Sequence, residues 1–158
     1  MPMTILLLLC VLIGGVSGLR SMMGIALVCW GAHLGWLSLG ATRLGFLASP
    51  ISLIVFSLLA VGELVADKLP AVPPRVQAGP LVVRIVFGAC AASALAMAAG
   101  ASFLLPAVVG GVAALCGTFI GYSLRKLIVN RGKVKDLLVA PVEDVVAILL
   151  GLFAVSRF

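Results

Sequence analysis

The sequence predicts an all-α membrane protein with about six transmembrane helices, and three observations support this fold class. Hydrophobic residues make up 63% of the 158 residues, charged residues only 10%, and the mean hydropathy is +1.33. The apolar residues form six long runs. The basic residues gather in alternate connections between those runs, as expected when helices cross a bilayer back and forth.

The composition excludes the common soluble classes. A soluble domain is about 45–50% apolar and about 25% charged. This chain has only 11 basic and 5 acidic side chains, too few to cover its apolar surface in water. An ordinary soluble enzyme, a disordered chain and a nucleic-acid-binding domain are therefore excluded, and we expect no nucleic-acid partner.

Six apolar runs are candidate spans, because a helix needs about 20 residues to cross a bilayer. No Lys or Arg precedes the first run, so we expect no signal peptide. The first two runs are short and nearly contiguous, so they can form two spans, a re-entrant hairpin or one long broken helix. The candidate runs are residues 3–19, 21–37, 50–65, 81–99, 102–128 and 137–155.

A proline-rich linker at 69–80 separates the third and fourth runs, because its prolines interrupt a continuous helix. It divides a single transmembrane domain, 1–158, into halves 1–70 and 80–158. Each half carries three runs. Because three is odd, two related halves would form a 3+3 inverted repeat, and we keep this as an alternative to an irregular bundle.

The basic residues predict the orientation. On the six-span reading, only Arg43 and Arg157 lie on one side of the membrane. Basic loops favour the cytoplasm, so we expect the richer side to be cytoplasmic and both termini external. The richer side carries nine residues: Arg20, Lys68, Arg75, Arg84, Arg125, Lys126, Arg131, Lys133 and Lys135.

Small residues recur at helical spacing in three runs. Such residues let helix backbones approach closely in lipid. They can serve packing within one bundle or the interface of a homodimer, and a dimer is expected because six short spans enclose little interior. The stripes are Gly14 and Gly18; Gly88, Ala92, Ala96 and Gly100; and Ala113, Gly117 and Gly121.

Charged residues inside the runs indicate a polar site. Glu63 and Asp67 are four residues apart, so they share a helix face. Glu143 and Asp144 lie in an antiparallel run, about 10 Å from the same surface as Glu63. We expect these groups to form two parts of one site near the cytoplasm. The predicted site residues are Arg20, Glu63, Asp67, Lys68, Arg84, Glu143 and Asp144.

Two readings of this predicted site stay open. Charges in a membrane are costly unless paired, so the residues can be a structural ion-pair network. They can also bind an ion or a substrate. Cys29 and His33 are four residues apart, but two ligands are too few for a metal site. The sequence has no catalytic or phosphate-binding motif, so we expect no enzyme activity, cofactor or metal.

Several motifs resemble one bacterial membrane family. They are the Gly18-Leu19-Arg20 segment, the Glu63-x3-Asp67-Lys68-x-Pro70 element, the Glu143-Asp144 pair, and the Gly110-Gly111 pair followed by Arg125. Together they resemble the family catalogued as domain of unknown function 4126. The resemblance covers nearly the whole chain and implies a multi-pass protein of the bacterial inner membrane. It implies no reaction, since the family has no established activity.

The sequence therefore favours a small helical transporter or channel with a charged site in the cytoplasmic half of the membrane and an unknown substrate. The alternative is a non-transporting membrane protein that binds lipid or acts as a scaffold, with its charges near anionic headgroups. The expected partners are the lipid bilayer, a second copy of the chain and a small ion or solute.

Overall fold

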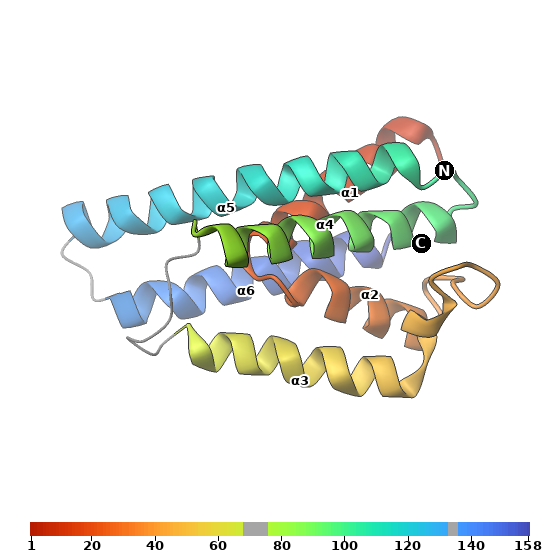
Figure 1. Ribbon diagram of the computed structural model, residues 1–158, viewed down its shortest axis with the longest axis horizontal. Coiled ribbons are helices and arrows are strands. Elements are labelled where there is room, and N and C mark those ends of the chain that lie inside the picture. Colours follow the sequence, from red (N-terminus) through yellow and green to blue (C-terminus); the bar gives the residue numbers. More distant parts are fainter. Residues whose placement is uncertain (68–75, 133–135) are drawn as a thin grey trace.

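The computed structural model describes residues 1–67, 76–132 and 136–158 and is all-α (Figure 1). Six α-helices and one short 3-10 helix make up the described part, which confirms the predicted fold class at that level. The elements are α1 (Met3–Leu19), α2 (Met23–His33), η1 (Gly45–Ala48), α3 (Pro50–Ala66), α4 (Ala78–Ala98), α5 (Leu104–Gly132) and α6 (Asp136–Val155).

Successive helices run in opposite directions along one long bundle (Figure 1). Both chain termini lie at one end, which we call the terminal end. The opposite end, where α3 and α5 finish and α4 and α6 begin, we call the charged end.

The first two runs form a helical hairpin. The chain reverses at residues 20–22, and α2 runs back towards the terminal end (Figure 1). The turn lies part-way along the bundle: Gly18 meets Thr118 of α5, which continues to Gly132, about 21 Å further at 1.5 Å per residue. Of the three predicted alternatives, one long broken helix is therefore wrong, and whether the two arms are two short spans or a re-entrant hairpin stays a prediction.

Three helix boundaries differ from the predicted runs by more than two residues. α2 ends at His33 and not at residue 37, because Gly35 has φ +79° and the N–H groups of residues 36 and 37 turn back to Gly31 O. α4 begins at Ala78, inside the predicted linker, since Pro80 lies in the first turn, where its missing N–H costs nothing. α5 continues beyond residue 128.

The most extensive helix packing is that of α1, α4 and α5, which meet through small residues. A Cβ on Gly110 would lie 2.6 Å from Gly88 O, and one on Gly117 would lie 2.8 Å from Gly15 O. Gly14 of α1 likewise faces Gly110. The glycines of these contacts thus serve close packing within one bundle, as one of the two sequence interpretations proposed.

Among the described residues, two helices are long and apolar enough to cross a membrane: α4 over Ala78–Ala98 and α5 over Leu104–Val129. Three shorter apolar helices accompany them, namely α1, α2 and α3. Many large apolar side chains point outward along the bundle, such as Ile51 at 74% exposure and Leu58 at 67%. These features suggest association with a membrane.

Candidate functional site

Arg20 is the centre of a charged cluster inside the bundle. It follows the last residue of α1, and its side chain is 0% exposed. Its Nε donates to Asp144 Oδ1 at 2.7 Å, and its Nη1 pairs with Asp67 Oδ2. One arginine therefore joins carboxylates from α3 and α6, and the acidic groups of the two helices belong to one cluster.

Glu63 of α3 caps the beginning of α2. Its Oε1 accepts a hydrogen bond from Ser21 N at 2.7 Å, and its Oε2 accepts one from Met22 N at 2.9 Å. The first N–H groups of a helix lack partners within the helix, and they favour a negative charge. The carboxylate satisfies both needs at a turn that has no side-chain cap of its own.

Arg84 of α4 holds the other side of the same turn. Its Nη1 donates to Gly18 O at 2.6 Å and to Leu19 O at 2.7 Å, and its Nη2 lies 3.4 Å from Glu63 Oε1. These carbonyls end α1, where a positive charge is favoured. Thr118 of α5 also donates to Gly18 O, at 3.0 Å. Buried charges from neighbouring helices thus cap both ends of the α1–α2 break.

A fifth helix contributes Arg125, whose Nη1 lies 3.7 Å from Glu143 Oε2. The predicted site did not include Arg125, because the sequence placed it at the edge of the fifth run. The signal that could have identified it is its spacing from Gly121. Arg125 lies four residues, about one helical turn, after Gly121, so the two share a helix face. Glu143 lies on that face, because its Oε1 would be 3.3 Å from a Cβ on Gly121.

The seven charged side chains that these contacts connect form one set, which we call the charged cluster. It contains six of the seven predicted site residues together with Arg125, whereas Lys68 lies outside the described residues. Among the residues described, it has three arginines and four carboxylates, a formal charge of −1, and includes four of the five acidic residues of the chain. Its members are Arg20, Glu63, Asp67, Arg84, Arg125, Glu143 and Asp144.

Comparison with protein families gives one match, which spans residues 7–157 and is described as a domain of unknown function (DUF4126). The chain belongs to the DUF4126 family. The resemblance seen in the sequence motifs is thereby confirmed. No curated protein and no solved structure matches the chain.

The cysteine and histidine side chains of this DUF4126 chain provide no metal site among the described residues. In the part of the chain that the structure describes, no group of three or more His, Cys, Asp and Glu side chains has the arrangement of a metal site. Cys29 is buried in α2, whereas His33 is exposed at the end of the same helix.

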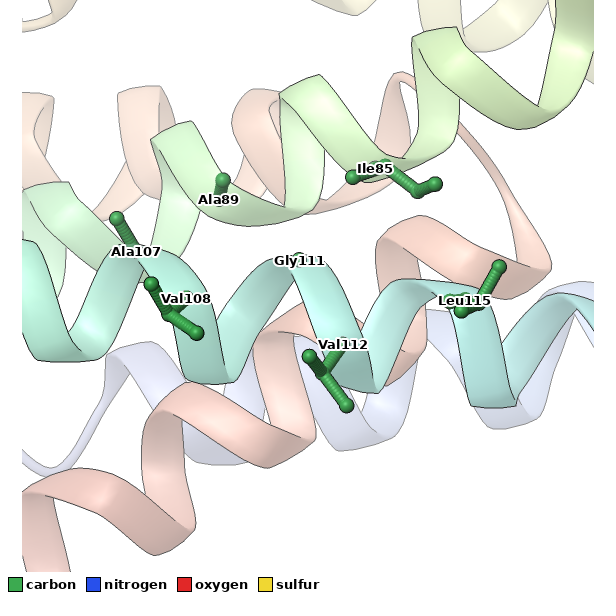
Figure 2. A pocket seen from close by; sticks show the side chains of 7 residues that line it. All are labelled: Ile85, Ala89, Ala107, Val108, Gly111, Val112 and Leu115. Carbon is green, nitrogen blue, oxygen red and sulfur yellow. The ribbon is translucent and has the colours of Figure 1, made fainter.

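A separate apolar groove of about 360 Å³ lies on the outside of α4 and α5 (Figure 2). It contains no member of the charged cluster. Its shape follows from the small residues that let the two backbones approach. Its lining residues are Ile85, Ala89, Ala107, Val108, Gly111, Val112 and Leu115.

Proposed function

We propose that this DUF4126 protein spans the bacterial inner membrane with the charged end towards the cytoplasm and moves a small ion or solute across the bilayer. The composition, the two long apolar helices and the exposed apolar side chains support insertion. The excess of basic residues at the charged end supports the orientation. We assign no catalysis to it.

In this proposal α1 and α2 form a re-entrant hairpin whose turn lies within the membrane. Turns and interrupted helices inside a membrane are tolerated where protein groups satisfy the backbone, and they commonly form transporter binding sites. Here Glu63 accepts a hydrogen bond from a backbone N–H group of the turn, and Arg84 donates one to a backbone carbonyl group. A 3+3 repeat would pair α2 with α5, the second helices of the two halves. These helices have 11 and 29 residues, so the repeat gains no support.

One observation carries the proposal: a fully buried arginine joins carboxylates of two different helices. A cation or proton that binds Asp67 or Asp144 competes with Arg20, and an anion competes with the carboxylates for the arginine. The first event weakens the ion pair of Arg20 with one neighbour and leaves the other, whereas the second weakens both. The charged cluster can therefore convert binding into a change of helix packing.

Flux through proteoliposomes tests the proposal. The purified protein is reconstituted, and uptake of protons (an entrapped pH dye), sodium and chloride is compared with empty liposomes. We expect at least one flux above background, reduced about tenfold or more in Glu63→Gln and Glu143→Gln. Arg43→Gln, an exposed change outside the cluster, is the matched control. Wild-type flux in both cluster variants would remove the site assignment.

A second candidate is a non-transporting membrane protein that binds lipid or acts as a scaffold. The mutual pairing of arginines and carboxylates favours it, because a structural network needs no ligand. It predicts no flux above empty liposomes and co-purified anionic lipid that is lost in Arg125→Gln. We also propose a homodimer, which cross-linking in native membranes tests directly.

A further inference from the structure

The reversal between α1 and α2 places two oppositely polarised helix ends next to each other inside the bundle. The carbonyl end of α1 is held by a cation, Arg84, and the N–H end of α2 is held by an anion, Glu63. The two side chains also contact each other at 3.4 Å. The turn therefore contains a complete receptor for an anion, which a carboxylate of the protein occupies.

The receptor is specific for a carboxylate shape. Two backbone N–H groups meet the two oxygens of Glu63 separately, at 2.7 and 2.9 Å, and the Arg84 guanidinium approaches one of them from the side. Charge-assisted bonds of this kind are among the strongest that an oxyanion makes. A free carboxylate of the same size has the atoms needed to replace all three contacts.

An independent observation at the same turn is the hydroxyl group of Ser17. It is 0% exposed, and its Oγ has no hydrogen-bond partner among the described residues. The Oγ points at Gly24 in the first turn of α2, where a Cβ would collide with it. A buried hydroxyl without a partner is unusual, and this one lies against the first turn of α2, the helix that begins beside the Glu63 carboxylate.

Glu63 is carried by α3, a helix at the edge of the bundle (Figure 1). In α3, which is described throughout, Ala60 is the one buried residue, and the helix packs on α2 and η1. The side chain of Glu63 is 15% exposed, whereas that of Arg84 is 3% exposed. The protein's own anion is thus on the accessible side of the turn, and the receptor groups are on the inner side.

We propose that the α1–α2 turn is a binding site for a small monocarboxylate, which displaces Glu63 from the N–H groups of Ser21 and Met22 and from Arg84, with Ser17 as a further donor. The assignment of this anion as the transported solute rests on the proposed function. The binding site itself does not.

Thermal unfolding of the purified variants in detergent tests the site, with sodium formate as the probe and sodium chloride at the same concentration as the ionic control. Removal of the internal carboxylate in Glu63→Ala lowers the Tm. Formate at tenfold its Kd then raises it by about 4 °C, more than chloride does. Glu63→Gln, which fills the space without the charge, is the matched control and shows no such rise. Equal effects of formate and chloride, or an equal rise in Glu63→Gln, overturn the proposal.

A measurement on wild type keeps the proposal testable if Glu63→Ala does not fold. Radiolabelled formate binds the wild-type protein saturably in equilibrium dialysis. Ser17→Ala lowers the affinity about fivefold, the loss of one hydrogen bond. Absence of saturable binding, or an unchanged affinity in Ser17→Ala, overturns the site as assigned.

The outcomes separate the site from the transport function. Formate binding without flux of any solute retains the site and removes transport. Flux that depends on Glu63, in a protein that does not bind formate, retains transport and overturns the carboxylate site.

Discussion

The substitution Arg20→Gln tests the electrostatic reasoning most directly. It leaves Asp67 and Asp144 buried without the guanidinium that bonds to both of them. Removal of one partner from a buried ion pair costs about 3–5 kcal/mol, since the remaining charge loses its compensation. For a chain of this length, that free energy corresponds to a fall in Tm of roughly 6–20 °C.

The assay is thermal unfolding in detergent, followed by the loss of the monodisperse peak in size-exclusion chromatography. Arg43→Gln is the matched control, because Arg43 is exposed and lies outside the charged cluster, so its loss costs about 0.5 kcal/mol or less. A triple variant with Arg20→Gln, Asp67→Asn and Asp144→Asn regains at least half of the lost Tm, because no uncompensated charge remains there. A single variant within about 3 °C of wild type, or a triple variant less stable than the single one, would refute the reasoning.

Three further changes test the packing and the helix ends by the same unfolding assay. Gly110→Ala lowers the unfolding free energy by about 1–3 kcal/mol, since its Cβ would lie 2.6 Å from a carbonyl oxygen of α4, whereas Gly62→Ala, with open space around it, causes no loss. An equal effect of the two changes would contradict close packing at that crossing. Thr118→Val costs about 1 kcal/mol through the lost bond to α1, and Thr118→Ser retains most of it. Ser49→Ala removes the cap that accepts from Ser52 N at 3.2 Å and costs about 1 kcal/mol, which Ser49→Asp avoids.

Local sequence patterns predicted the number and type of the helices well, because long apolar runs and prolines act over short distances. Helix direction and rise placed Glu63 and Asp144 at one depth, but they did not indicate the pairs, in which Arg20 meets Asp67 and Asp144 and Arg84 meets Glu63. The small residues predicted close packing, and Gly14 and Gly110 provide it within one chain. Whether they also serve a dimer stays a prediction.

The hairpin could not be decided from the sequence, because no glycine or proline marks the break at residues 20–22. The turn depends on Arg20 and its neighbours meeting Glu63 and Asp144, which lie about 40 and 120 positions later in the chain. Arg125 was missed for a related reason. Its role depends on a contact with Glu143, 18 positions later in the chain, which hydropathy alone does not indicate.

The packing of α1 has a consequence for the order in which the protein assembles during synthesis. α1 leaves the ribosome first, yet it packs most extensively with α5, which begins at Leu104. Three other helices, α2, α3 and α4, are therefore synthesised before α5 is available to pack on the glycine face of α1. A nascent chain stalled before α5 would expose that face and leave Thr118 unavailable to the turn. We expect such a chain to be degraded faster than one that includes α5, because the packing that completes the fold is missing.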